Sequence, residues 1–200
     1  MLSSVFIAAS AAVALLLGFL HLLYTFRGPK LHPRDPDLTE KMKTISPVIS
    51  RGTTMWRAWI GFNASHSFGI ILFGAVYGYL ASCHSVFLFH SWFLLALGFA
   101  LLLGYAVLAK LYWFRAPFRG VLLAAVLYLL GIVLNLATQI RRWAILWITR
   151  KAASIETAKD RGQQNQLPAM RHTLSNTIQY QRLLIGFRTR IRVICWVKLD

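Results

Sequence analysis

Residues 58–109 read AWIGFNASHSFGIILFGAVYGYLASCHSVFLFHSWFLLALGFALLLGYAVLA, a run of 52 residues without Asp, Glu, Lys or Arg. A bilayer core about 30 Å thick is crossed by about 20 helical residues, so this run is too long for one crossing. Its most polar tetrapeptide is Ser82-Cys83-His84-Ser85, where we expect the chain to turn. The run therefore predicts two membrane spans, near residues 58–81 and 86–109.

Two further uncharged stretches, residues 1–26 and 120–140, lie on either side of this run. They predict spans at about residues 2–26 and 120–137, each as a helix because an open strand leaves its backbone unpaired in lipid. The first is expected to be a retained helix, since it lacks the basic start and short apolar core of a cleaved leader. The predicted fold is an all-α membrane protein, with a four-helix transmembrane bundle over residues 1–140 and a tail over residues 141–200.

The composition excludes an ordinary soluble enzyme. Apolar residues make up 57% of the chain and charged residues 14%, with a mean hydropathy of +0.55, whereas soluble domains carry about 25% charged residues. No H-E-x-x-H, G-x-S-x-G, P-loop or C-x-x-C motif is present, and no Asp, Glu, Lys or Arg falls inside a predicted span. The sequence therefore favours a non-enzymatic membrane protein.

The net charge of +16 is spread between and after the apolar runs. This distribution favours lipid headgroups over nucleic acid as the partner. Loop 27–57 carries seven basic residues and loop 110–119 carries three, while the loop near Cys83 carries none. The positive-inside rule then places the two basic loops in the cytoplasm and the N-terminus outside.

The tail beyond residue 140 is basic and lacks a clean apolar face for a second core. Twelve Lys or Arg and three acids follow Gln139. Two interpretations remain open for residues 141–200: a basic segment lying on the membrane interface, or a segment without defined structure. Anionic lipid headgroups are the predicted partners of loop 27–57 and of this tail.

Small residues recur every fourth position in the second predicted span, which lets a neighbouring helix backbone approach closely. We expect two such rows to mediate helix packing: Gly61, Ser65 and Gly69, and Gly74 and Gly78.

The same span holds the most polar stretch inside any predicted span, Gly61–Gly69. Asn63, His66 and Ser67 share one helical face there. His66 lies roughly 13 Å from the inner end of its helix, counted from Arg57. His21 lies roughly 9 Å from the inner end of its helix, counted from Arg27, so the two histidines could meet at similar depth. In the fourth span, Tyr128 and Asn135 lie on one stripe that we expect to face the bundle interior.

Three interpretations of these polar side chains remain open. The histidines hydrogen-bond neighbours and fasten the bundle, or a polar pocket between the first, second and fourth spans binds a small hydrophobic or redox ligand. In the third interpretation, His21 and His66 are axial ligands of a haem b in an electron-transfer protein; otherwise no cofactor or metal is predicted. The candidate ligand-binding residues are His21, Asn63, His66, Ser67, Tyr128 and Asn135.

Three segments together resemble a family of small four-helix bacterial integral membrane proteins without an assigned activity. They are Met55–Gly69 with Phe73-Gly74, Gly18–His21 with Thr25, and Tyr112–Pro117 with Gly120. The likeness covers about residues 1–140. It implies the four-helix fold and a bacterial cytoplasmic (inner) membrane, and it adds no catalytic residue. A structural or accessory subunit of a larger membrane complex, or a homo-oligomer, is the alternative function.

Overall fold

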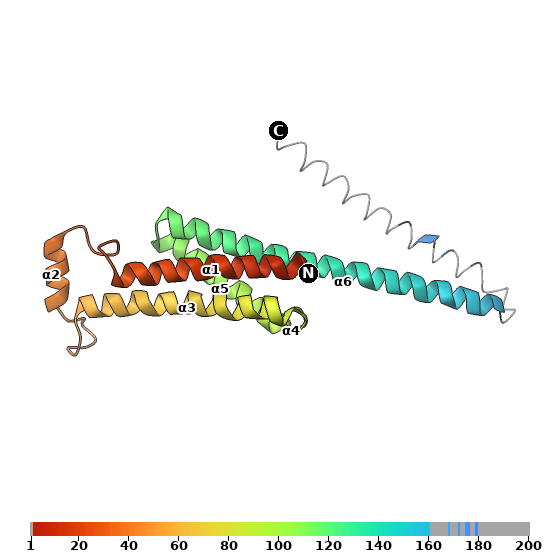
Figure 1. Cartoon of the computed structure of the whole chain (residues 1–200), viewed down its shortest axis with the longest axis horizontal. Coiled ribbons are helices and arrows are strands. Elements are labelled where there is room, and N and C mark those ends of the chain that lie inside the picture. The colour runs from red at the N-terminus through yellow and green to blue at the C-terminus, as the bar shows by residue number, and fades with distance from the viewer. Residues whose placement is uncertain (1, 161–167, 169–171, 173–174, 177–178, 180–200) are drawn as a thin grey trace, which may run out of the picture. The chain divides into compact units, whose positions relative to one another are not determined.

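The structure, a computed structural model, describes residues 2–160 together with residues 168, 172, 175, 176 and 179 (Figure 1). All regular structure in this part of the chain is helical, as the sequence predicts. The chain divides into two compact units, Met1–Asn135 and Leu136–Asp200. The helices are α1 (Leu2–Phe26), α2 (Pro36–Thr44), α3 (Met55–Cys83), α4 (Ser85–His90), α5 (Trp92–Tyr112) and α6 (Arg115–Asp160).

Four of these helices, α1, α3, α5 and α6, are long and apolar enough to cross a membrane. The predicted first span, residues 2–26, has the bounds of α1, and α3 extends the predicted second span by a few residues at each end. Thr54 caps α3 by accepting a hydrogen bond from the Arg57 N–H (3.3 Å), because a threonine at this position satisfies a free N–H of the first turn.

The third span begins later than the sequence predicted. Residues 85–90 form the separate short helix α4, and α5 starts at Trp92. The break lies at Ser91, whose backbone is extended (φ −94°, ψ 95°) and whose hydroxyl accepts a hydrogen bond from the Leu94 N–H (3.3 Å). A serine cap inside an apolar run restarts the helix there, so the predicted start at residue 86 is corrected to Trp92.

The fourth span begins at Arg115 instead of residue 120, with Pro117 in the first turn, where its missing N–H costs no helical bond. The helix continues past the predicted end at residue 137 as far as Asp160. Residues 141–160, the first third of the predicted tail, are therefore helical. For this segment, the interpretation that the tail has no defined structure is wrong. Most of the remaining tail lies outside the described residues.

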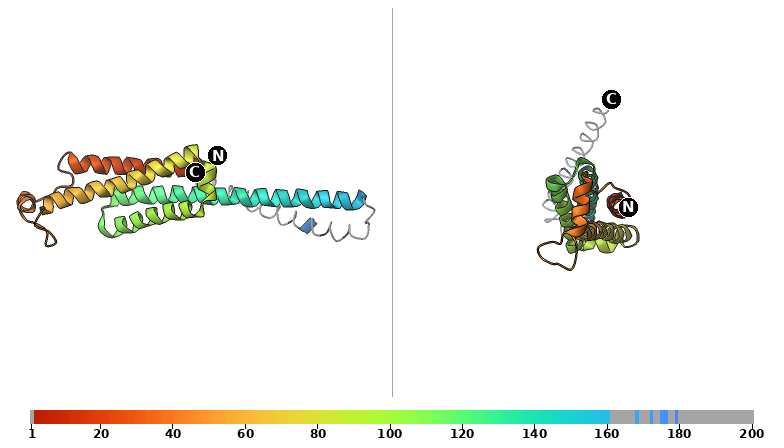
Figure 2. Two further views of the ribbon diagram at one scale, coloured as in Figure 1. Left: turned by 90° about the horizontal axis from the view of Figure 1, so that it is seen from below. Right: turned by 90° about the vertical axis from the view of Figure 1, so that its left-hand side faces the viewer.

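Within the first unit, α1 lies at one side of the bundle and packs against both α3 and the first part of α6 (Figures 1 and 2). Its buried face consists largely of small residues, among them Ser10, Ala11 and Ala14. A Cβ placed on Gly74 of α3 would lie 2.8 Å from the Ala11 carbonyl oxygen, and one placed on Gly131 of α6 would lie 2.9 Å from that of Ser3. Glycine therefore permits both close approaches to α1.

The two small-residue rows of α3 differ in what they contact. Gly74 and Gly78 face α1, and a Cβ on Gly78 would make an ordinary 3.5 Å contact with Ala11. Gly61 has open space around it, and Ser65 is exposed with its hydroxyl donating to Phe62 O of its own helix (2.9 Å). Gly69 faces the Tyr105 hydroxyl. At Gly61 and Ser65 the first row thus packs against none of the described helices.

Candidate functional site

The polar side chains of α1 and α3 meet where α3 begins. His21 Nε2–H donates to Asn63 Oδ1 (3.2 Å), and Asn63 Nδ2 donates to Trp59 O one turn back (2.8 Å). The second bond turns the amide oxygen of Asn63 toward α1, which requires the proton of His21 on Nε2. Asn63 is only 8% exposed, so the pair forms a buried polar link between the two helices.

His66 lies beside this link with its imidazole among aromatic rings. Its ring centroid is 4.7 Å from that of Trp113 and 5.1 Å from that of Tyr105, both in edge-to-face geometry. The His21 ring is 5.6 Å away, also edge to face. We call His21, Asn63, His66, Tyr105 and Trp113 the histidine cluster.

The hydrogen bonds around His66 differ from those around His21. Among the described residues, neither ring nitrogen of His66 has a hydrogen-bond partner, although the residue is half-buried. The Tyr105 hydroxyl lies 3.5 Å from the backbone oxygen of His66, which is a long contact. Edge-to-face ring contacts can satisfy an N–H only weakly. The imidazole of His66 therefore keeps its hydrogen-bonding capacity.

The histidine cluster lies near one boundary of the apolar layer. Trp113 caps the C-terminal end of α5, three residues after Lys110. Tryptophan and lysine at the end of a span are typical of the headgroup level. His66, which contacts Trp113, therefore lies near the headgroup level, where the polar ends of lipid-soluble molecules are found.

A second polar group lies near the opposite end of α3. Tyr128 of α6 is fully buried against Tyr77 of α3, with ring centroids 5.7 Å apart. The Tyr77 hydroxyl donates to Leu94 O (2.6 Å) and that of Tyr128 to Leu95 O (3.2 Å), so both bond the first turn of α5. These phenols have partners and serve to fasten three helices.

The six predicted ligand-binding residues do not converge on one pocket. His21, Asn63 and His66 meet, and Ser67 lies one turn further, fully buried, with its hydroxyl donating to Asn63 O (2.9 Å). Tyr77, which contacts Tyr128, is fourteen residues from Asn63, or about 21 Å along the helix.

Asn135 follows Tyr128 by seven residues on α6, beyond Gly131. Gly131 packs against Ser3 at the start of α1, so Asn135 lies toward the end of α1 away from His21. Neither Asn135 nor Tyr128 can therefore line one small site with His66.

Sequence reasoning selected neither Trp113 nor Tyr77 as a site residue. Tyr77 could have been found from spacing, because the buried face of α3 runs from Asn63 through Ser67, Ile70 and Gly74 to Tyr77 at helical intervals. Trp113 could not, since it follows the last residue of α5 and only the fold of the connection brings its ring back to His66.

The haem b alternative stays a prediction that close packing does not favour. One turn from His21, a Cβ placed on Gly18 would lie 3.2 Å from the Ile71 backbone nitrogen. The helices that carry the two histidines therefore approach too closely there for a porphyrin to enter between them.

An open hollow of about 480 Å³ lies over the turn between α3 and α4. It is lined by Cys83, His84, Ser85, Val86, Phe87 and His90. His84 Nε2 lies 3.1 Å from the Tyr79 hydroxyl, and His90 Nδ1 donates to Val86 O (2.8 Å). Both histidines thus have a hydrogen-bond partner close by in the chain. The hollow therefore offers fewer unpaired hydrogen-bonding groups to a ligand than His66 does.

Comparison with family models, with curated proteins and with solved structures finds no match to this chain. The fold itself defines the class: with four helices long and apolar enough to cross a bilayer, the chain is a multi-pass membrane protein.

Proposed function

We propose that this chain is a non-enzymatic protein of a bacterial cytoplasmic membrane that binds a lipophilic molecule bearing a carbonyl group, with His66 as the hydrogen-bond donor. The observation that carries the proposal is the half-buried imidazole of His66, which has four neighbouring rings and no hydrogen-bond partner among the described residues. A polar group inside a membrane protein is costly unless it is paired, and it marks a candidate site.

The surroundings of His66 suit a flat or branched apolar body with one polar end. Phe62 stacks on the imidazole at a centroid distance of 6.4 Å, and Tyr105 and Trp113 meet it edge to face. Aromatic rings give apolar contact at a low cost in conformational entropy. Quinone carbonyls and the ester carbonyls of a phospholipid share this chemistry, and both reach the boundary where Trp113 lies.

Replacing His66 with alanine is expected to lower the amount of co-purifying lipophile at least about fivefold, since one neutral hydrogen bond contributes about 1 kcal/mol. The full-length protein is purified in mild detergent and its organic extract is quantified by mass spectrometry, which separates quinones from phospholipids. Ser65→Ala is the matched control, because Ser65 is exposed and bonded only within its own helix. Equal retention by both variants, or no lipophile above the detergent blank in the unmodified protein, would falsify the proposal.

Asn63→Ala separates binding from packing. It removes the acceptor for His21 and the bond to Trp59 O, and interhelical bonds in membranes contribute about 0.6–2 kcal/mol. We expect this variant to lose thermal stability more than lipophile, and His66→Ala to do the reverse. The same loss of stability in both variants would assign His66 to packing.

We further propose that the N-terminus and the Cys83 turn face outward and that loops 27–57 and 110–119 face the cytoplasm, on the basis of their basic residues. In a Cys195→Ser background, exposed Cys83 should react with a membrane-impermeant maleimide in intact cells. An Ile45→Cys variant that also lacks Cys83 should react only after permeabilisation. Labelling of both positions from the same side contradicts this topology.

A role as an accessory subunit or homo-oligomer is the second candidate. It is favoured by the surface of α3 at Gly61 and Ser65, which presents small residues outward and packs against no helix in the described part of the chain. Such a surface permits close approach of another membrane helix. Native mass spectrometry from mild detergent tests it, and a purely monomeric species would oppose it.

A further inference from the structure

The connection between α2 and α3 is a closed loop with a defined turn at its tip. The Met55 N–H donates to Ile45 O (2.8 Å) and joins the two ends of residues 46–54. Inside this loop the Ser50 N–H donates to Pro47 O (3.2 Å), which forms a turn around Val48 and Ile49. The two apolar residues are thus held at the tip by backbone hydrogen bonds on both sides. We call residues 46–54 the apolar loop.

Val48 and Ile49 have the highest exposure among the large apolar residues of the described chain, at 108% and 93%. They belong to no membrane helix, so the lipid that surrounds the spans does not account for this exposure. The end-on view in Figure 2 shows the loop between α2 and α3 projecting sideways beyond the helices. Two adjacent branched side chains presented in this way form a small exposed apolar surface, of the kind that marks a contact with a membrane or a protein.

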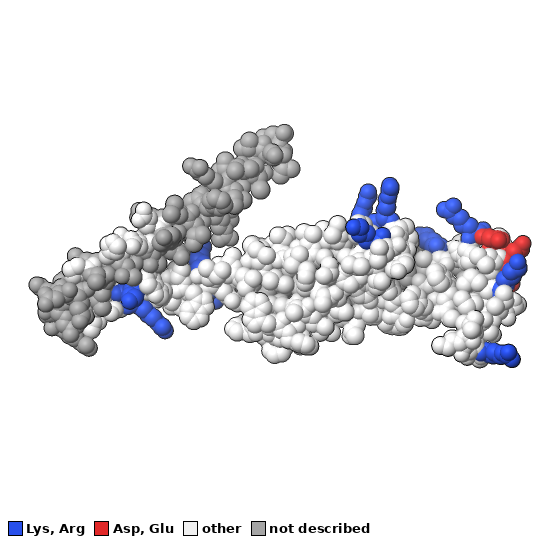
Figure 3. Space-filling model, turned by 180° about the vertical axis from the view of Figure 1, so that it is seen from behind, with Lys and Arg blue, Asp and Glu red and all other residues white. Residues whose placement is uncertain are grey.

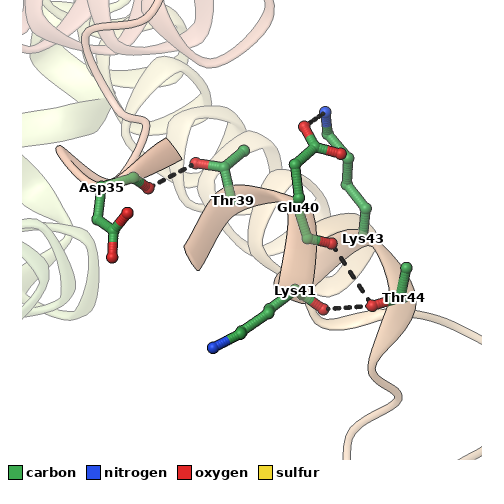
Figure 4. Close-up of polar contacts among 6 residues, drawn as sticks. All are labelled: Asp35, Thr39, Glu40, Lys41, Lys43 and Thr44. Atoms are coloured by element: carbon green, nitrogen blue, oxygen red, sulfur yellow. Dashed lines mark hydrogen bonds and ion pairs between the residues drawn. The ribbon is translucent and has the colours of Figure 1, made fainter. Parts of the chain in front are cut away.

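The basic side chains around the apolar loop differ in whether they are paired with an acid. Lys43 is paired with Glu40 (2.7 Å), whereas the ammonium group of Lys41 points away from both (Figure 4). Arg51, next to the tip, has no ion pair among the described residues. Asp35 and Asp37 lie at the start of α2, where the Asp35 carboxylate accepts the Asp37 N–H (3.0 Å).

Basic residues exceed acids seven to three across residues 27–57. Figure 3 shows Lys and Arg side chains gathered at this end of the first unit, with few acids among them. The apolar tip therefore lies in a region of positive charge, which selects an anionic surface over a neutral one.

We propose that the apolar loop inserts Val48 and Ile49 into the headgroup layer of an anionic leaflet, with Arg51 and Lys41 against lipid phosphates. The membrane is within reach, since Thr54 at the end of the loop caps the membrane helix α3. A protein partner fits less well, because specific protein interfaces bury about 800 Å² per partner and two side chains offer only a fraction of that area. The proposal is independent of a ligand at His66.

The test uses the full chain in vesicles, with Cys83 and Cys195 replaced by alanine and a nitroxide label on Val48→Cys. Collision rates with oxygen and with a water-soluble nickel chelate report whether the label lies in lipid or in water. Asp37→Cys, exposed on α2, gives the water reference, and Leu72→Cys, exposed at mid-α3, gives the lipid reference. Val48 contacts little of its own chain, so this substitution leaves the fold intact.

In vesicles that contain phosphatidylglycerol, the label at residue 48 should resemble the Leu72 reference. Arg51→Gln should lower the equilibrium constant for insertion about fivefold, the effect of one basic residue near an anionic surface. Pure phosphatidylcholine should move the label toward the Asp37 reference. The proposal is overturned if the label behaves like the Asp37 reference in anionic vesicles, if it inserts equally in neutral ones, or if both reagents are excluded, which indicates a protein contact.

Discussion

Gly74→Ala is expected to destabilise the bundle by about 1–3 kcal/mol, the usual cost of added volume in a packed interior. The new Cβ would lie 2.8 Å from the Ala11 carbonyl oxygen and 2.6 Å from Leu15 Cγ. A backbone oxygen cannot rotate away as a side chain can, so α1 must move as a whole. Thermal unfolding in mild detergent, followed by circular dichroism, measures the loss.

The matched control is Gly61→Ala on the same helix. A Cβ there meets nothing within 4 Å, so only the better helix propensity of alanine remains, which leaves stability unchanged or raises it by up to about 1 kcal/mol. The effects of the two glycine-to-alanine substitutions on stability should therefore differ in sign or clearly in size. Equal effects at the two positions would mean that α1 does not pack against α3 at Gly74.

Gly98→Ala should have the second large effect, of about the same size, because two tyrosines converge on Gly98. Its Cβ would lie 2.7 Å from the ring of Tyr77 and even closer to the Tyr128 hydroxyl. Both rings are buried and both hydroxyls bond the first turn of α5, so neither can withdraw without losing a bond. Gly104→Ala, with open space at the same helix, is the control.

A double-mutant cycle sharpens this prediction. Tyr128→Phe alone removes one hydrogen bond and is expected to cost about 1 kcal/mol. In that background Gly98→Ala should cost less than in the unmodified chain, because the hydroxyl that the new methyl group meets is gone. Additive losses would show that Gly98 and Tyr128 are not in contact.

The spans could be predicted because charge is so costly in lipid that uncharged runs alone delimit them. The break at Ser91 could not, since one serine in an apolar run is as consistent with a continuous helix as with a cap. The sequence also did not indicate which face of α3 is buried. Gly61 and Gly74 both belong to small-residue rows, and only the position of α1 decides that Gly74 is buried and Gly61 is not.

The proximity of His21 and His66 followed from counting residues inward from Arg27 and Arg57, and the rings do lie side by side. The sequence also predicted that Tyr128 shares a pocket with these histidines, although it lies with Tyr77. The reason is that α6 begins deeper than α1 ends. Gly120 packs against Leu17, ten residues before Arg27, so the basic residues of the two loops do not lie in one plane.

The buried hydroxyl of Ser10 donates to Ala124 O (2.7 Å), 114 residues later in the chain. During synthesis α1 enters the membrane first, yet this partner and the contact with Gly131 emerge only with the last span. Until then one side of the first helix has no neighbour from its own chain. Assembly is therefore completed by the arrival of α6, and a nascent chain that stops before residue 115 would leave α1 open to insertion factors or to membrane proteases.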